Sequence, residues 1–272
     1  MDDMSVKAFI FDWAGTMVDH GCCAPVLALQ TVFADEGVAI TDEDARADMG
    51  KAKDAHIRAI LAKPRVADQW TAVKGTPATD NDVSRLFSAV GPLMQAAAAQ
   101  CSALIPGAVD LVETLRARGV KIGSSTGYTR DMMRDILPLA KNQGYAPDFT
   151  VCAGETSEGR PAPFMIWKNL IELGVWPTSS CVKVDDAPVG IVAGRNAGCW
   201  TIGVAASGNE IGLSLEAYTQ LDQAERETRL QTARSVLKAA GAHYVVDSVA
   251  DIPALLDELD QRIRAGEMPA QI

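Results

Sequence analysis

The chain has 272 residues, of which 48% are hydrophobic, 22% are charged and 6% are aromatic. This length and composition predict one large globular α/β domain, or a core domain that carries a smaller inserted one, and exclude a fibrous or disordered protein. The 35 acidic and 25 basic residues give a net charge of −10. That balance argues against nucleic acid or an anionic membrane as the main partner.

Several features bear on cellular location. The opening segment MDDMSVKAFIF has no basic region and only a short apolar run, so we expect no signal peptide. The weakly polar stretch 90–109 is interrupted by prolines and glutamines and does not predict a membrane span. Six cysteines without a C-x-x-C pair are too few for a disulfide scaffold in this length. We therefore expect free thiols in a cytoplasmic protein.

Short apolar runs alternate with amphipathic stretches along most of the chain. The apolar runs predict strands at 6–11, 120–123, 181–184, 200–204 and 243–246. The amphipathic stretches predict helices at 108–118, 129–139, 163–173, 188–197 and 225–240. This alternation is typical of βαβ units, so we expect a doubly wound, Rossmann-like parallel sheet with its ligand at the carboxyl ends of the strands.

One region interrupts this alternation. Residues 21–100 contain no convincing strand, and helical patterns follow one another at 25–36, 43–49, 53–62 and 80–99. We expect an all-helical second domain at 21–99, inserted in a core domain made of 1–20 and 100–272. The Pro106-Gly107 pair marks the return to the core.

The first strand ends in FDWAGTMVD, which places Asp12 at the carboxyl edge of the sheet. A carboxylate there can act as a nucleophile, a metal ligand or both. A lone aspartate after a strand is more often a helix cap. The assignment therefore depends on what the other strands carry.

Two further segments could bind a phosphate group. The run SSTGYT after the second strand can form a nest of backbone N–H groups, with the Thr126 hydroxyl aimed at the same oxygen. Arg160 in EGRPAPF could clamp a phosphate with its planar fork. Taken alone, a helix cap and a surface arginine are the simpler interpretations.

The segment VKVDDAPVG delivers two adjacent acids at the end of a buried strand. Carboxylates in this position suit Mg²⁺, which takes few protein oxygens and keeps several waters. Because adjacent residues face opposite ways, we expect one of Asp185 and Asp186 to bind metal and the other to be structural.

These four segments, in this order and each at a strand end, resemble the haloacid dehalogenase superfamily, and the helical insertion resembles its C1 cap. The resemblance covers nearly the whole chain. Superfamily phosphatases usually carry Asp-x-Asp in the first motif, where the second acid protonates a leaving alkoxide, but this chain has Ala14 there. Many members also carry an acid where this chain has Gly190, and Asp185 could take over that acid's role beside the metal.

The insertion contains MGKAKDAHI, which puts Lys53 and His56 on one helix face. A lysine shielded beside a phosphate site could attack a carbonyl, although a solvated cap lysine is the simpler interpretation, as for Lys51 and Lys63. Together with DWAGT, GYT, GRPAP and NAGCWTIGV, this motif resembles the phosphonoacetaldehyde hydrolase (phosphonatase) family.

The resemblance implies a set of site residues. Asp12 would be the nucleophile and Lys53 the Schiff-base lysine. Asp12, Asp186 and the backbone carbonyl of Ala14 would hold Mg²⁺. The phosphonate would be bound by Thr126 and Arg160, and the aldehyde end would be lined by the residues Cys22, Met49, His56 and Tyr128.

The implied reaction is Mg²⁺-dependent hydrolysis of the C–P bond of phosphonoacetaldehyde to acetaldehyde and phosphate, in 2-aminoethylphosphonate degradation. It would pass through a Lys53 imine and an Asp12 aspartyl phosphate. Because the carbon would leave as an enamine, no acid is needed at position 14. The resemblance also implies a homodimer formed through the cap, and the apolar helix 25–36 with Phe33 could supply the face.

Other functions stay open at this stage. A superfamily phosphatase acting on another small phosphorylated or phosphonate metabolite is the nearest alternative, and Ala14 argues against it. A haloacid dehalogenase would leave Lys53 and the Asp185-Asp186 pair unexplained. A non-catalytic phosphate-binding protein would explain Ala14 as lost activity, and a Schiff-base aldolase would release no phosphate.

Overall fold

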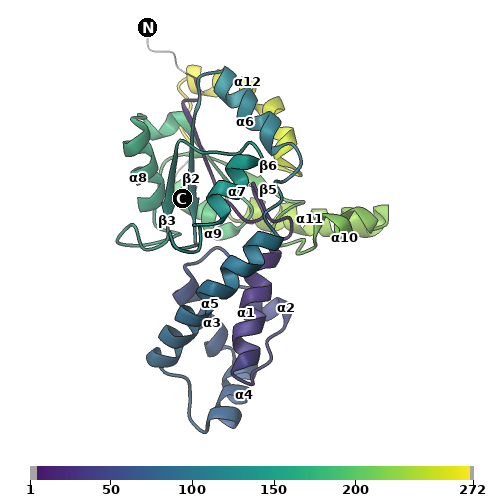
Figure 1. Ribbon diagram of the computed structural model, residues 1–272. Helices are drawn as coiled ribbons and strands as arrows, with labels where there is room; N and C mark the ends of the chain where they lie inside the picture. The colour runs from purple at the N-terminus through teal and green to yellow at the C-terminus, as the bar shows by residue number, and fades with distance from the viewer. Residues whose placement is uncertain (1–4, 270–272) are drawn as a thin grey trace.

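The computed structural model describes residues 5–269, with the side chains at 98 and 99 left out. Its centre is a six-stranded, all-parallel sheet in the order β3-β2-β1-β4-β5-β6 (Figure 1). The strands are β1 (Ala8–Phe11), β2 (Lys121–Thr126), β3 (Phe149–Cys152), β4 (Cys181–Asp185), β5 (Trp200–Val204) and β6 (Tyr244–Val246). The predicted doubly wound parallel sheet is confirmed.

The two central strands are covered on both faces. Every residue of β1 and β4 is buried, and Phe11 is in register with Ser124 of β2 and Val184 of β4. Strands buried on both sides are expected to be apolar throughout rather than alternating, as AFIF and most of CVKVD are. Because all strands run the same way, β1, β2 and β4 end side by side.

Helices pack on both faces of the sheet. One face is covered by α8 (Phe164–Leu173), α9 (Pro188–Asn196) and α11 (Gln223–Ala239). The other carries α6 (Ala108–Ala117), α7 (Ile136–Asn142), the 3-10 segment Val249–Leu255 and α12 (Leu256–Arg264). The short helix α10 (Leu215–Gln220) and the 3-10 turn Thr178–Ser180 complete this part of the chain.

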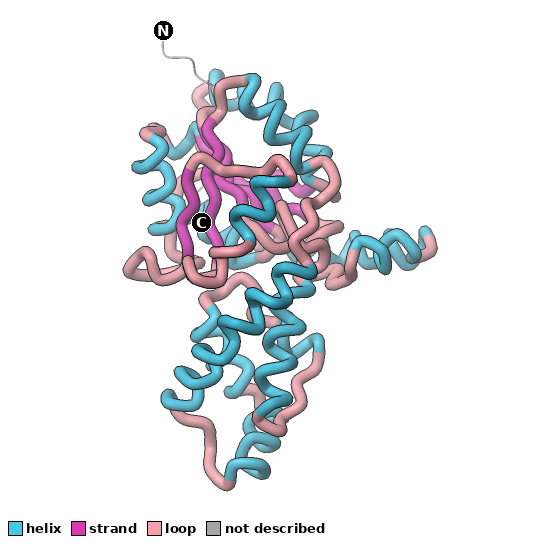
Figure 2. The backbone as a smooth tube through the Cα atoms, in the orientation of Figure 1, coloured by secondary structure: helices cyan, strands magenta, loops and turns pink. Residues whose placement is uncertain are grey.

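The helices between β1 and α6 form a separate lobe below the sheet (Figures 1 and 2). They are α1 (Cys23–Asp35), α2 (Asp42–Arg46), α3 (Lys53–Ala62), α4 (Pro64–Lys74) and α5 (Asp80–Gln100), and no strand lies among them in this described stretch. The longest pair, α1 and α5, packs together, with Trp70 and Ile57 fully buried nearby. We call this lobe the cap; its predicted bounds, residues 21–99, and those of the core stay a prediction, and residues 1–4 and 270–272 lie outside the description.

Most predicted elements lie within two residues of the observed ones, but the helix predicted at 129–139 is wrong. Residues 129–135 form turns, and the helix begins only at Ile136. Pro138 explains this, because its ring and missing N–H are tolerated only in the first turn of a helix. The elements β3, α4, α10 and α12 were not predicted from the sequence.

The structure also bears on the expectations about the cysteines and about membrane spans. All six cysteines are free thiols, as expected. None of the helices in residues 5–269 is both long and apolar enough to cross a membrane.

The predicted dimer face on helix 25–36 stays a prediction. Phe33, Leu29 and Val32 of α1 are buried inside the chain, and Leu27 is the large apolar residue of this helix that is well exposed. The buried apolar residues of α1 pack against α5 within the cap.

Candidate active site

The carboxyl ends of three neighbouring strands carry the polar residues that the sequence singled out. Asp12 directly follows β1, Thr126 ends β2, Asp185 ends β4, and Asp186 follows directly. The cap closes over this edge and leaves a small pocket between the two parts of the chain. The pocket is lined mainly by the predicted site residues, which are Asp12, Ala14, Cys22, Met49, Lys53, Thr126, Tyr128, Arg160 and Asp186.

Asp12 is almost completely buried, with 6% of its surface exposed. Its backbone N–H donates to the Val184 carbonyl at 3.0 Å, which continues the sheet by one residue, and its Oδ1 lies 3.0 Å from Arg160 Nη1. Burial raises the pKa of Asp12, and the Arg160 charge counteracts this. The ion pair therefore favours the carboxylate form, which a nucleophile or metal ligand requires.

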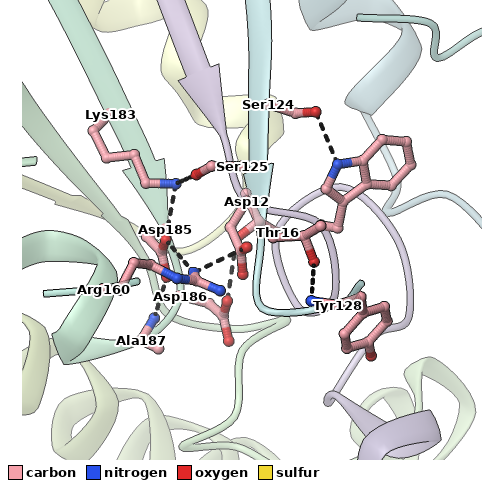
Figure 3. A network of polar contacts seen from close by, with 12 residues as sticks. Asp12, Thr16, Ser124, Ser125, Tyr128, Arg160, Lys183, Asp185, Asp186 and Ala187 are labelled. Atoms are coloured by element: carbon pink, nitrogen blue, oxygen red, sulfur yellow. Dashed lines mark hydrogen bonds and ion pairs between the residues drawn. The ribbon is translucent and has the colours of Figure 1, made fainter. Parts of the chain in front are cut away.

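Arg160 belongs to a buried row of alternating charges (Figure 3). Its Nη1 also lies 3.1 Å from Asp185 Oδ2, and the same oxygen is 2.9 Å from Lys183 Nζ. Asp185 further accepts the backbone N–H of Ala187 at 3.1 Å. Because the Asp185 carboxylate forms ion pairs with both Arg160 and Lys183, it holds Arg160 in place and does not point into the pocket.

A close approach explains why residue 190 is a glycine. A Cβ atom there would lie only 1.9 Å from Asp185 Oδ2, so the carboxylate fills the space that a side chain would need. The chain therefore places an acid from β4 in the space beside Gly190.

Asp186 is the carboxylate of this edge that lacks a cationic partner. It accepts from the Asn209 backbone N–H at 2.9 Å, from Thr16 Oγ1 at 3.2 Å and from Cys22 Sγ at 3.3 Å. In the described chain, no ion pair with Lys, Arg or His is formed by Asp186. Burial, together with the nearby carboxylates of Asp185 and Asp12, raises its pKa to about 8.

This charge arrangement fits a divalent cation. Oxygens of Asp12, Asp185 and Asp186 lie within 4.8 Å of one another, and hard oxygen ligands are those that Mg²⁺ prefers. Since the Asp185 carboxylate is already paired with the side chains of Arg160 and Lys183, Asp12 and Asp186 are better placed to bind the ion. Ala14 borders the same pocket. The buried acidic cluster could thus hold a metal ion.

The loop after β2 forms the wall opposite Asp186. The Thr126 hydroxyl accepts the backbone N–H of Tyr128 at 3.1 Å. A Cβ at Gly127 would lie 2.9 Å from the Lys51 carbonyl of the cap. Glycine therefore allows the cap to approach this loop closely.

Lys53 is the first residue of α3 and is only 3% exposed. Burial lowers its pKa to about 8. Its Nζ lies 5.6 Å from the centre of the Tyr128 ring. The cap lysines Lys51 and Lys63 instead form ion pairs with Asp48 and Asp44 and are partly exposed, so burial separates Lys53 from them.

His56 lies behind Lys53 rather than in the pocket wall. Its Nδ1 is 3.5 Å from Lys53 Nζ, and its Nε2 is buried without a hydrogen-bond partner. Burial and the Lys53 charge lower its pKa to about 2. The neutral imidazole can accept a hydrogen bond from the amine of Lys53. The other residues expected at the aldehyde end, Met49, Cys22 and Tyr128, do border the pocket.

Sequence reasoning missed several residues of the site. Lys183 is completely buried in β4, and a lysine inside an apolar strand was the available signal. Trp13 Nε1 donates to Ser124 Oγ at 2.9 Å and thereby ties the loop after Asp12 to β2. Nothing in the sequence pattern indicated the contacts of Arg46 and Asn209, which are described below.

Comparison with known proteins agrees with this geometry. Residues 6–198 match the family of haloacid dehalogenase-like hydrolases. The chain is 46% identical to the phosphonoacetaldehyde hydrolase of Paraburkholderia phytofirmans, over 97% of this chain and 99% of the relative. It is 43% identical to the phosphonoacetaldehyde hydrolase of Vibrio cholerae, over 99% of this chain and all of the relative.

Solved structures give the same result. A phosphonoacetaldehyde hydrolase-like protein from Oleispira antarctica superposes with a TM-score of 0.96 at 43% identity, covering 97% of this chain and 96% of that one. A β-phosphoglucomutase from Clostridium difficile has a TM-score of 0.68 at 18% identity, covering 96% of this chain and 99% of that one. This second likeness concerns the fold alone.

The fold and its acidic site define a haloacid dehalogenase-like hydrolase. Within this class, the chain belongs to the phosphonoacetaldehyde hydrolase family.

Proposed function

We propose that this protein hydrolyses the C–P bond of phosphonoacetaldehyde to acetaldehyde and phosphate. The observation that carries the proposal is the buried Lys53, which the cap places in the wall of the pocket that also contains Asp12 and Arg160. Relatives that share 40–46% of the sequence over nearly the whole chain bear this enzyme's name or that of a protein like it.

Lys53 would supply the electron sink. Its neutral amine attacks the aldehyde carbon, and loss of water gives a protonated imine. His56, whose Nδ1 lies 3.5 Å away, can accept a hydrogen bond from the neutral amine and orient it. Because the C–P bonding electrons can then move into the imine, the carbon leaves as a neutral enamine and not as a carbanion.

Asp12 would accept the phosphoryl group. Its carboxylate attacks phosphorus as the C–P bond breaks, and water later hydrolyses the aspartyl phosphate to phosphate. The enamine is protonated at carbon, and hydrolysis of the resulting imine releases acetaldehyde and regenerates Lys53. No alkoxide leaves, so Ala14 in place of an acid is compatible with this chemistry.

The phosphonate charge would be held by Arg160, the Thr126 hydroxyl and the N–H groups of the loop after β2. Asp12, Asp186 and the Ala14 carbonyl would hold Mg²⁺, which would neutralise charge on the transferring group. The proposal also includes three expectations from the family resemblance. The substrate arises in 2-aminoethylphosphonate degradation, the protein is cytoplasmic, and it forms a homodimer through the cap.

The decisive experiment measures phosphate and acetaldehyde from phosphonoacetaldehyde, with and without Mg²⁺, in wild type and in the Lys53→Arg variant. Arginine keeps the charge but cannot act as an amine nucleophile at neutral pH. We expect activity to fall by roughly three orders of magnitude or more, since each 1.36 kcal/mol of lost stabilisation is tenfold.

Borohydride treatment with substrate separates the alternatives. It should inactivate wild type and label the peptide that carries Lys53, and the matched variants Lys51→Arg and Lys63→Arg should still be labelled there. A superfamily phosphatase for another metabolite would not be trapped, and a Schiff-base aldolase would be trapped without releasing phosphate. Ordinary turnover of Lys53→Arg would exclude the imine mechanism.

A further inference from the structure

The loop that follows β5, residues 205–214, touches three parts of the molecule. Its Ser207 carbonyl accepts the Gly21 N–H at 2.7 Å, at the point where the chain enters the cap. The Ser207 hydroxyl donates to the Gly15 carbonyl at 2.7 Å, and the Asn209 N–H donates to Asp186. We call this segment the post-β5 loop.

Arg46 of the cap helix α2 forms hydrogen bonds with this loop. Its Nη2 donates to the Gly212 carbonyl at 3.0 Å, and its Nη1 donates to the Gly21 carbonyl at 2.7 Å. Asp42 orients the guanidinium through Nε at 2.7 Å. A Cβ at Gly212 would lie 2.9 Å from Arg46 Nε, so the loop offers the arginine a position that only glycine leaves open.

Arg46 and Asn209 bind each other reciprocally. The Asn209 side-chain amide donates to the Arg46 carbonyl at 3.1 Å, and Arg46 Nη1 donates to Asn209 Oδ1 at 3.4 Å. Asn209 is 6% exposed and the Arg46 side chain 15%, so water competes little for these contacts. Neither residue borders the pocket that contains Asp12.

Arg46 and Asn209 also contact the segments that carry Lys53 and Asp186. The Arg46 carbonyl also accepts the Met49 N–H at 3.0 Å, at the start of the segment that leads to Lys53. Asn209 contacts Asp186 through its backbone and Arg46 through its side chain. The imine-forming lysine of the cap and the metal-binding edge of the core are thus joined through two residues.

We propose that Arg46 and Asn209 are positioning residues that hold the cap in register with Asp186, so that Lys53 and Asp12 meet the same substrate molecule. The inference rests on the proposed function for its catalytic consequence. Its structural consequence, a cap held closed on the core by this pair, is independent of the substrate.

The experiment uses Asn209→Ala, which removes both side-chain contacts to Arg46 but keeps the backbone N–H that binds Asp186. We expect kcat/KM for phosphonoacetaldehyde, and the rate of borohydride trapping on Lys53, to fall about tenfold, since hydrogen bonds to a charged group are lost. Mn²⁺ binding, measured by electron paramagnetic resonance, should stay within about twofold, because the Asp186 contacts remain.

Two further variants complete the test. Arg46→Lys keeps the charge but lacks the fork, and we expect its losses to be at least as large as those of Asn209→Ala, because its contacts to Gly21 and Gly212 are weakened as well. The double variant should be no worse than Arg46→Lys. Both should enlarge the radius of gyration in X-ray solution scattering. The control Arg58→Ala removes a cap arginine that pairs with Asp80 at the surface, away from the core, and should match wild type in every measurement.

Unchanged scattering and unchanged kcat/KM in both variants would overturn the proposal. So would a parallel loss of Mn²⁺ binding in Asn209→Ala, which would mean that the side chain merely maintains the loop. A wild-type enzyme that releases no acetaldehyde would refute the proposed function, while the scattering comparison would still decide whether this pair closes the cap.

Discussion

At the scale of single residues, burial shifts the pKa values of ionisable groups in the site. Lys53 is buried with a pKa near 8, and its amine is flanked by a histidine that stays neutral. An unfolded lysine keeps its proton up to about pH 10.5, so burial destabilises the fold below about pH 8 and this penalty fades as the pH rises towards 10.5. Burial of Lys53 therefore lowers the stability of the fold at neutral pH and increases the neutral fraction of its amine.

This shift predicts the pH dependence of imine formation. The reactive form is the neutral amine, whose fraction increases with pH and reaches half at the pKa of Lys53, about 8. We expect the initial rate of trapping with cyanoborohydride and substrate to rise between about pH 6 and about pH 9 and then to level off. A rate that keeps rising up to an ordinary lysine pKa of about 10.4 would mean that burial does not tune this amine.

A second prediction at this scale concerns Gly190. In Gly190→Ala the new Cβ would displace the Asp185 carboxylate and break its ion pairs with Arg160 and Lys183. Disturbing a buried charge cluster costs about 3 kcal/mol, so we expect a clear fall in melting temperature and a loss of activity of about a hundredfold.

The control for this prediction is Gly91→Ala, because Gly91 also lies inside a helix and a Cβ there meets nothing within 4 Å. It should be neutral or slightly stabilising. The double variant Asp185→Gly/Gly190→Asp returns a carboxylate to nearly the same space and should recover part of the activity. A fully active Gly190→Ala enzyme would show that Asp185 can move without consequence.

At the scale of elements, apolar strands and amphipathic helices were predictable because each carries its own periodic signal. The helix at Lys53–Ala62 and the strand at Trp200–Val204 have the predicted ends. The edge strand Phe149–Cys152 was missed, although its Phe, Thr and Val are residue types enriched in strands. The contacts of Asp185, Lys183 and Arg46 could not be predicted, since they depend on how distant segments meet and not on local spacing.

The close contact between cap and core also depends on Gly50. Gly50 has a φ of +90°, and a Cβ there would lie 2.7 Å from Val189 of the core helix α9. In Gly50→Ala we expect the cap to sit less closely and kcat/KM to fall about tenfold or more, since small misplacements of reacting groups are costly.

Gly75→Ala is the matched control, because Gly75 has a similar φ of +79° in the cap but a Cβ there contacts nothing within 4 Å. Both variants carry the same backbone strain, of about 1 kcal/mol, so their melting temperatures should be lowered alike. Steady-state kinetics then isolates the effect of the contact with Val189. Equal activities of the two variants would contradict a role for this close approach.

At the scale of the whole molecule, the topology determines which part of the chain contributes each residue of the pocket. Parallel strands bring Asp12, Thr126 and Asp186 to one edge of the sheet, and the helical insertion after β1 brings Lys53 over it. The sequence indicated these residues because each stands at a strand end or in a recognisable motif. Their roles rest on the family resemblance, and their proximity became visible only in the folded chain.

The last prediction concerns the charge of this site as part of the whole fold. Three buried carboxylates face two buried cations, and Asp186 has no cationic partner of its own within the described chain. A divalent cation that binds only the folded protein should stabilise it, by about 2.7 kcal/mol at a hundredfold excess over Kd. For a chain of this size we expect Mg²⁺ to raise the melting temperature by roughly 5 °C. Asp186→Asn should abolish this shift without lowering the melting temperature of the metal-free protein, because burial already favours the neutral form of Asp186 and asparagine is neutral and of similar size. The exposed Asp68→Asn variant loses the same formal charge and should keep the shift. If Asp186→Asn responded to Mg²⁺ as strongly as Asp68→Asn does, the ion would stabilise the protein through its overall negative charge, and the edge formed by Asp12 and Asp186 would not be the metal site.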